Sequence, residues 1–367
     1  MTKLTDICDI QYGYAFDSKC FSDDEAYLPL IRIRDVKRGY SETFYNGDYP
    51  EEYIIHAGDL LVGMDGEFNI ARWKSRDALL NQRVCKIVEK KETNGEYIRF
   101  FLSRALKEIE NRTAFVTVKH LSAKELNRIE LNLPSVEKQT KIAESLCKIE
   151  NIITHLRTQL EKLDLLVKAR FVEMFENIEN MCTIADACSI ITDGTHQPPK
   201  FTTDGIPFLF VSNIATNEIV YNAEKFISEE TYNDLYKRTP IEIGDIILST
   251  VGSYGHPAIV KTNKKFLFQR HIAYLKPIPT TINSIYLHRA ILSDNVQRQI
   301  DERVKGIAQK TLNLSEIRKI VIPAPPLELQ TQFANFVKQV DQSKSILQQE
   351  LTQTQTLFDS LMQEYFG

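Results

Sequence analysis

The 367-residue sequence lacks the short motifs that usually mark an enzyme active site. It contains no Gly-Lys pair, so a GxxxxGK[ST] phosphate loop is excluded, and HExxH and GxSxG are missing as well. The two Pro-Pro pairs, in QPPK and APPL, do not resemble the motif that grips a target base in amino-methyltransferases. No glycine-rich loop suited to adenosylmethionine follows a first strand. The sequence therefore carries none of these catalytic signatures.

Signs of a metal site or a cofactor site are also missing. The six cysteines form no CxxC pair, and no His/Cys cluster has the spacing of zinc ligands. We interpret them as buried free thiols in a reducing cytoplasm. The cysteines are Cys8, Cys20, Cys85, Cys147, Cys182 and Cys188.

No apolar run approaches the roughly 20 residues that span a bilayer. The start, MTKLTDICDI, lacks the apolar core of a signal peptide, so we expect a cytoplasmic protein. With 43% hydrophobic and 26% charged residues, a packed, soluble chain is expected. The net charge of −4 counts mildly against a nucleic-acid partner, because such proteins usually carry a basic surface.

An internal repeat is the strongest feature that the sequence does contain. The segment IELNLPSVEKQTKIA (129–143) aligns with IVIPAPPLELQTQFA (320–334) at an offset of 191 residues, with identities that include Pro134/Pro325 and Gln139/Gln330. Three further matches occur upstream in the same order, so we predict a duplicated unit. They pair Gly58-Asp59 with Gly244-Asp245, LPLIRIRDV with IPFLFVSNI, and Gln82-Arg83 with Gln269-Arg270.

Each repeat ends in a segment with the apolar period of a coiled-coil seam. Apolar residues alternate at spacings of four and three from Ile142 to Val167, and six of the eight positions 191 residues later are apolar. A helix of about 40 residues would be on the order of 60 Å long. We predict that the two helices pair antiparallel, with packing of each helix on its own domain as the alternative.

The globular halves show short β-rich runs separated by turn residues, with helices expected around 96–111 and 285–305. The predicted fold class is mixed α/β: two pseudo-two-fold-related globular domains separated by two long antiparallel helices. We place the domains at 1–133 and 179–322 and the spacer helices at 134–178 and 323–367.

One triplet suggests chemistry. Asp35-Val36-Lys37 is predicted to end a strand, which is the arrangement of metal ligand and base in many nucleases. The equivalent residues in the second repeat, Asn213-Ile214-Ala215, can neither bind a metal nor take a proton. We therefore interpret the triplet as a strand-end turn. A self-contained nuclease and a coiled-coil scaffold that does not touch DNA are alternative functions that the sequence leaves open.

Four segments of the second half together resemble the specificity subunit of type I restriction-modification systems. They are TDGTHQPPKFTTDGIPFLFVSNI (192–214), GDIILSTVG with the following YGHPAIV, QRHIAYLKP (269–277) and GIAQKTLNLSEIRKIVIPAPPLELQTQFA (306–334). The first half repeats the pattern more loosely through QYGYAFDSK, LIRIRDV, AGDLLVG and VKHLSAKELNRIELNLPSVEKQ. The first half has Val-Lys-His where the second has AQKTL, so the two halves need not recognise the same DNA sequence.

The resemblance implies a non-catalytic DNA reader. Each globular half would be a target recognition domain for one half of a split site in double-stranded DNA, and the helices would set the gap between the half-sites. The helices would also dock methyltransferase subunits, typically two, and restriction/translocase subunits would complete the complex. Adenosylmethionine, ATP and magnesium would belong to those partners, so this chain itself would hold no cofactor or metal.

Polar side chains that can reach base edges or phosphates are the expected DNA-binding residues. The predicted contacts to bases are Arg32, Arg34, Asp35, Gln82, Arg83, Asp193, Thr195, His196, Asn213, Gln269 and Arg270. The predicted contacts to phosphates are Lys119, Lys200 and Lys310.

Overall fold

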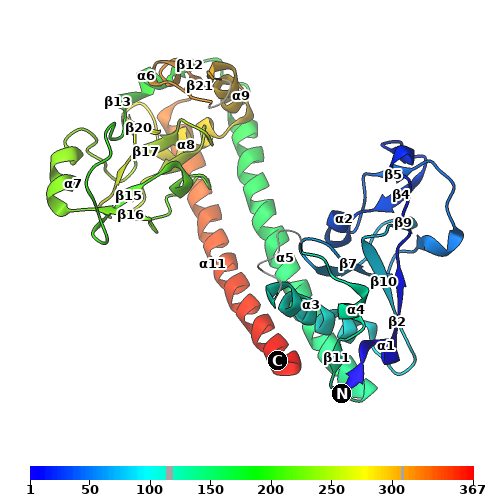
Figure 1. Cartoon of the computed structure of the whole chain (residues 1–367). Helices are drawn as coiled ribbons and strands as arrows, with labels where there is room; N and C mark the ends of the chain where they lie inside the picture. The colour runs from blue at the N-terminus through cyan, green and yellow to red at the C-terminus, as the bar shows by residue number, and fades with distance from the viewer. Residues whose placement is uncertain (113–118, 307–309) are drawn as a thin grey trace. The chain divides into compact units, whose positions relative to one another are not determined.

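The structure, a computed structural model, describes residues 1–112, 119–306 and 310–367 (Figure 1). Two compact units divide the chain: unit 1 is Met1–Arg157 with Gln349–Gly367, and unit 2 is Thr158–Gln348. Two helices of 40 residues, α5 (Val136–Phe175) and α11 (Leu327–Phe366), each contribute one stretch to each unit. Val118, in the Val-Lys-His stretch, and 307–309 lie outside the described residues.

Unit 1 begins with a four-stranded antiparallel sheet, in the order β2-β10-β7-β8. A five-stranded sheet, β3-β5-β4-β9-β6, and the pair β1-β11 accompany it. Short 3-10 turns lie at Ser18–Cys20 and Glu51–Tyr53. The elements are β1 (Thr2–Lys3), α1 (Leu4–Ile7), β2 (Cys8–Tyr12), β3 (Phe21–Ser22), β4 (Leu28–Ile31), α2 (Ile33–Arg38), β5 (Phe44–Tyr45), β6 (Ile54–Ile55), β7 (Leu60–Gly63), β8 (Asn69–Arg72), β9 (Ala78–Leu80), β10 (Val84–Glu89), α3 (Gly95–Arg112), α4 (Ala123–Leu126) and β11 (Glu130–Leu131).

Unit 2 repeats this topology, except that its second sheet has four strands where that of unit 1 has five. Its sheets run β13-β20-β17-β18 and β14-β16-β15-β19, and β12 pairs with β21. The elements are β12 (Met181–Thr183), α6 (Ile184–Ala187), β13 (Cys188–Asp193), β14 (Phe201–Thr202), β15 (Ile206–Leu209), the 3-10 turn Val211–Asn213, β16 (Lys225–Ile227), α7 (Glu229–Tyr236), β17 (Ile246–Ser249), β18 (Pro257–Ile259), β19 (Leu267–Phe268), β20 (Ile272–Pro277), α8 (Ser284–Ile291), α9 (Asp294–Arg303), α10 (Leu314–Ile317) and β21 (Val321–Pro323).

The repeated strand order confirms the duplication and the mixed α/β class that the sequence predicts. Even the parallel pair recurs, since β4 runs beside β9 and β15 beside β19. One helix prediction is wrong in detail. The expected helix at 285–305 is broken into α8 and α9, because the Ser293 hydroxyl accepts a hydrogen bond from the Val296 N–H and starts a new helix.

The predicted apolar stripe of the long helices is buried or half-buried along its length. On α5, Ile142, Leu146, Ile153, Leu156 and Val167 are all less than 9% exposed. In unit 1 the stripe joins the core of the globular part together with Met362 of α11. The helices therefore pack partly on the globular parts and partly on each other.

Within unit 2 the pairing of α5 with α11 is antiparallel. Asp164 forms an ion pair with Lys344 at 2.7 Å, and further along α5 the ring of Phe171 lies 5.6 Å from that of Phe333. The partner's number falls as the number on α5 rises, which defines the direction. Lys344 breaks the apolar pattern of the sequence stripe, and its ion pair explains how a charge is accommodated there.

A buried glutamine attaches the start of each long helix to the globular part. Gln139 accepts a hydrogen bond from the Asn94 N–H at 2.9 Å and donates to the Pro134 carbonyl at 2.9 Å. Gln330 repeats both bonds with Asn283 and Pro325, at 2.8 and 2.9 Å. These bonds give a physical reason for the glutamine identity in the repeat.

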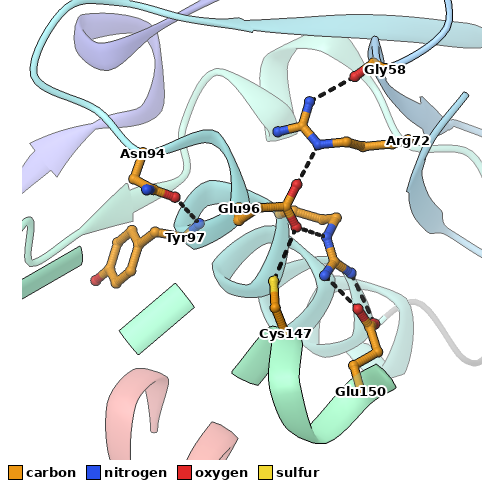
Figure 2. A network of polar contacts seen from close by, with 8 residues as sticks. Gly58, Arg72, Asn94, Glu96, Tyr97, Cys147 and Glu150 are labelled. Atoms are coloured by element: carbon orange, nitrogen blue, oxygen red, sulfur yellow. Dashed lines mark hydrogen bonds and ion pairs between the residues drawn. The ribbon is translucent and has the colours of Figure 1, made fainter. Parts of the chain in front are cut away.

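A network of charged side chains fastens α3 to α5 in unit 1 (Figure 2). Arg99 of α3 makes two bonds to Glu150 of α5, at 3.0 and 2.6 Å, and one to Glu96 at 2.6 Å. Glu96 also pairs with Arg72 of β8, and the Cys147 thiol donates to Glu96 at 3.7 Å. Figure 2 shows Glu96 at the centre of this network, between the sheet and the helix.

The six cysteines are free thiols, and burial raises the pKa of Cys8, Cys85 and Cys188 to about 12. Among the described residues, no helix combines the length and the apolar character needed to cross a membrane.

The glutamine junction makes a testable contribution to stability. We expect Gln139→Ala to lower the free energy of unfolding of unit 1 by about 1–3 kcal/mol, because it removes a buried side chain that satisfies a half-buried N–H and a half-buried carbonyl. Urea unfolding followed by fluorescence of the single tryptophan, Trp73, reports on unit 1. Lys138→Ala, at an exposed position of the same helix within unit 1, is the control and should change stability little. Equal effects of the two substitutions would contradict the proposed role.

The Glu96 network predicts a pH dependence. Burial alone would raise the pKa of Glu96, but hydrogen bonds from Arg72 and Arg99 outweigh it and hold that pKa below its ordinary value of 4.5. The lowered pKa stabilises the fold above pH 4.5, and this contribution is lost as pH falls through the folded-state pKa. Glu96→Gln should cost about 1–2 kcal/mol at pH 7 and progressively less below pH 4.5, measured by urea unfolding. A cost that is independent of pH would contradict the role of the charge.

Candidate nucleic-acid interface

A shared backbone arrangement positions the polar loops of both units. Where β2 ends, the Gly13 N–H donates to the Val84 carbonyl at 3.0 Å, and Gly194 repeats this bond with Ile272 at 3.1 Å. A Cβ on Gly13 would lie 2.1 Å from the carbonyl oxygen of Asn81, so no larger residue fits here. The close approach fixes where the residue after each glycine lies.

Backbone bonds correct one part of the sequence alignment. The Met64 N–H donates to the carbonyl of Arg83, and the Thr250 N–H donates to that of His271, at 3.0 and 2.9 Å. Arg83 is therefore equivalent to His271, and the Gln-Arg pairs that the sequence aligned are shifted by one residue. Both repeats contain the dipeptide Gln-Arg, and aligning these identical residues directly concealed the one-residue shift.

In unit 1 a charged cluster forms where three loops meet. Asp65 follows β7 and pairs with Arg83 at 3.2 Å and with His120. Beside it, the Gly66 N–H donates to the Lys119 carbonyl at 2.9 Å, and the Lys119 ammonium pairs with Glu110 at 2.9 Å. Of these, sequence reasoning predicted Arg83 and Lys119 and missed Asp65 and His120 as site residues.

In unit 2 the corresponding edge carries a different cluster. Asp193 at the end of β13 pairs with His196 at 2.9 Å and with Arg238, which follows α7, at 2.7 Å. The backbone of Thr195 forms a parallel β-bridge with Gln269, and the Arg270 N–H donates to the Thr195 carbonyl at 3.1 Å. Five predicted residues therefore lie together here, while Arg238 was missed because its partner is 45 positions away.

A cavity of 320 Å³ opens at this edge, lined by Asp193, Thr250, Val251, Arg270, His271 and 311–314. Burial, and then the charge of Arg270, lower the pKa of His271 below its ordinary value of 6.5. At neutral pH this imidazole is therefore neutral and offers one donor and one acceptor, which suits contact with a base edge.

Asp35 has a structural position. It lies on helix α2, not at the end of a strand as the sequence predicted, and its side chain is 1% exposed. Its Oδ2 accepts the Arg32 N–H at 2.9 Å and so caps the helix, while Lys37 pairs with Glu67 at 3.3 Å. These contacts count against the nuclease arrangement and against a base contact by Asp35.

Asn213 occupies the equivalent position in unit 2. Its Oδ1 accepts the Phe210 N–H at 2.9 Å, and its amide donates to the Val220 carbonyl at 3.0 Å. With 9% exposure it holds the loop in shape and presents little surface to a ligand. The matching pair Asp35/Asn213 in the repeat is thus explained by capping.

The remaining predicted residues lie apart from the two clusters in the contacts that the structure shows. Arg32, Arg34, Gln82, Lys200 and Lys310 are exposed. The Lys310 carbonyl accepts the Gly252 N–H at 3.2 Å, which is the counterpart of the bond between Lys119 and Gly66. In residues 1–112, 119–306 and 310–367, no group of three or more His, Cys, Asp or Glu side chains is placed to hold a metal ion.

Fold and site together define a class of protein: a duplicated α/β reader whose two units carry different polar side chains on one shared framework. A family model described as the type I restriction modification DNA specificity domain matches residues 1–164 and 177–355. The chain therefore belongs to the family of type I restriction-modification specificity subunits, which recognise DNA.

Individual relatives agree with this assignment. The chain is 31% identical to the type I restriction enzyme EcoBI specificity subunit of Escherichia coli, over 92% of this chain and 78% of that protein. It is 21% identical to the MjaVIII specificity subunit of Methanocaldococcus jannaschii, over 92% and 85%.

Solved structures share the fold. The type I restriction-modification S subunit from M. genitalium superposes with a TM-score of 0.60 at 14% identity, covering 100% of this chain and 95% of that one. A chain from a structural study of assembly and conformational transition of the type I R-M system gives 0.54 at 15% identity, covering 100% and 96%.

The cap predicts how Asp35 responds to substitution. Asp35→Ala should lower the free energy of unfolding of unit 1 by about 1 kcal/mol, because α2 loses its cap. Asp35→Asn should be nearly neutral, because asparagine caps the equivalent turn at Asn213. Trp73 fluorescence during urea unfolding is the measurement, since Trp73 and Val36 of α2 share a core cluster. Equal losses for both substitutions would show that the negative charge, not the cap, is needed.

Proposed function

We propose that this chain reads a two-part DNA site, one half-site through each unit, as the specificity subunit of a type I restriction-modification complex. The observation that supports this proposal is that the two units share one backbone framework but carry different side chains on it. Gly13 and Gly194 hold the same backbone geometry, but Tyr14 follows one glycine and Thr195 follows the other. Different polar groups on one framework suit the reading of two different base sequences.

The second part of the proposal is that the long helices dock methyltransferase subunits, two per chain. Both helices expose large apolar side chains, which is typical of a surface that a partner covers. Exposed fractions are 62% for Leu165, 50% for Val172, 59% for Ile346 and 50% for Leu357. A restriction subunit would join the same complex.

We further propose that the chain is not an enzyme and that its partners carry the chemistry. Adenosylmethionine would be bound by the methyltransferase, and ATP and magnesium by the restriction subunit. The proposal is supported by the roles of the residues with the strongest catalytic appearance, since Asp35 caps α2 and Lys37 is paired with Glu67.

Modified-base sequencing tests the proposal as a whole. DNA from cells that express this chain with its methyltransferase should carry methylation at a site of two fixed parts separated by an unspecified gap, and cells that lack this chain should not. Methylation that is unchanged without the chain would overturn the proposal. A scaffold that does not touch DNA would give an assembled complex whose binding to duplex DNA does not weaken steeply with salt.

The helices should act as a ruler. Deleting seven residues from each helix, 157–163 and 347–353, preserves the apolar period and removes about 10.5 Å of helix. The gap between half-sites should shorten by about three base pairs, at 3.4 Å each. Methylation-site sequencing measures the gap, and Lys162→Ala, an exposed substitution within the segment, is the control that should leave it unchanged. An unchanged gap in the deletion variant would contradict the ruler.

A further inference from the structure

Each unit contains an aspartate that contacts both an arginine and a histidine; in unit 1 both partners come from other loops, and in unit 2 only the arginine does. In unit 1 Asp65 contacts the guanidinium of Arg83 at 3.2 Å and the imidazole of His120. The carboxylate is 22% exposed, whereas the side chains of Arg83 and His120 are 51% and 47% exposed. The anion is thus recessed, and the two hydrogen-bond donors face outward.

Unit 2 has the same trio at different positions in the chain. Asp193 is 17% exposed and contacts His196 at 2.9 Å and Arg238 at 2.7 Å. His196 is 52% exposed and Arg238 is 49% exposed. A recessed carboxylate again lies behind one outward arginine and one outward histidine.

The two trios are not copies inherited through the duplication. The position equivalent to Asp65 is Val251, because the backbone of Asp65 forms an antiparallel β-bridge with His120, as that of Val251 does with Thr311. The position equivalent to Asp193 is Tyr12, since Tyr12 precedes Gly13 and pairs with Cys85 of β10, as Asp193 precedes Gly194 and pairs with Ala273 of β20.

Both trios nevertheless lie at the same edge of their units. Asp193 lines the same cavity as Val251 and Thr311, which are the counterparts of Asp65 and His120. Two unrelated sets of positions have therefore placed the same chemical groups at the same part of the framework. Stability alone gives no reason for this, because exposed ion pairs contribute only about 0–1 kcal/mol.

The trio has the properties that base recognition requires. A free arginine samples many rotamers, and an ion pair with a fixed carboxylate reduces the entropy lost on binding. Arginine can donate two parallel bonds to O6 and N7 of guanine in the major groove. The neighbouring imidazole adds a donor, and also an acceptor when it is neutral.

We propose that Arg83 with His120, and Arg238 with His196, determine specificity by contacting bases of the two half-sites, and that Asp65 and Asp193 are their positioning residues. The inference rests on the proposed function and extends it to His120 and Arg238 and to the positioning roles of the aspartates. Each unit then reads its half-site with the same kind of polar trio built from different loops.

The test uses the complex of this chain with its methyltransferase and sequences the methylated sites. Arg83→Ala should relax at least one base in one half-site, and Arg238→Ala at least one base in the other, with discrimination reduced on the order of ten- to a hundredfold. Arg83→Lys should relax the same base, because lysine cannot make the two parallel bonds. The unaltered half-site and gap within each variant show that the chain is folded.

Arg128→Ala is the matched control for unit 1, since Arg128 is exposed and lies outside the trio. Asp65→Asn should weaken discrimination at the same base as Arg83→Ala while the urea unfolding followed by Trp73 stays within about 0.5 kcal/mol of wild type. A purely structural role of Asp65 would move unfolding and leave the methylated sequence unchanged.

Binding of the assembled complex to a panel of duplexes settles any variant that methylates too little to sequence. Loss of preference at one base supports the proposal. A uniform loss of affinity for every duplex, with a salt dependence smaller by about one phosphate contact, would mean that the arginine touches the backbone and would overturn it. Variants that keep the wild-type site would overturn it too. Absence of any two-part site for wild type would instead refute the proposed function.

Discussion

The rest of the architecture depends on the junction between each globular part and the long helix that follows it. A glutamine there is almost fully buried and satisfies one backbone N–H and one carbonyl at the same time, through Gln139 in unit 1 and Gln330 in unit 2. Losing either bond inside the protein would leave a polar group unsatisfied, which is costly. The globular part is thus attached to its helix with a defined direction, and direction is what a two-part reader has to control.

Stability and recognition are largely assigned to different residues. The framework depends on buried contacts that recur in both units. These are the glycines at positions with no room for a side chain, the caps formed by Asp35 and Asn213, and the apolar strands. The outward residues of the loops do not recur and contribute little to folding. Loop residues can therefore change without unfolding the domain, which is the condition for one fold to present different polar surfaces.

Aspartate illustrates how burial decides the role of a residue. Asp35 is enclosed and caps a helix, whereas Asp65 is recessed behind the more exposed side chains of Arg83 and His120 and contacts both. Asp245 is buried against Tyr274 and Lys276, and burial raises its pKa above the ordinary value even though those two partners act to lower it. The same carboxylate can cap, position or brace, and only its surroundings distinguish these uses.

The repeat, the two long helices, the mixed α/β class and the Gln139/Gln330 match were all predictable, because periodicity and internal identity are properties of the chain itself. The placement of Asp35 on a helix, the break between α8 and α9 and the one-residue shift near Arg83 were not, because local patterns do not resolve turn geometry. The ion pairs of Asp65 with His120 and of Asp193 with Arg238 join residues 55 and 45 positions apart. Such partners are chosen when the strands assemble, so the tertiary structure alone decided which polar side chains face outward together.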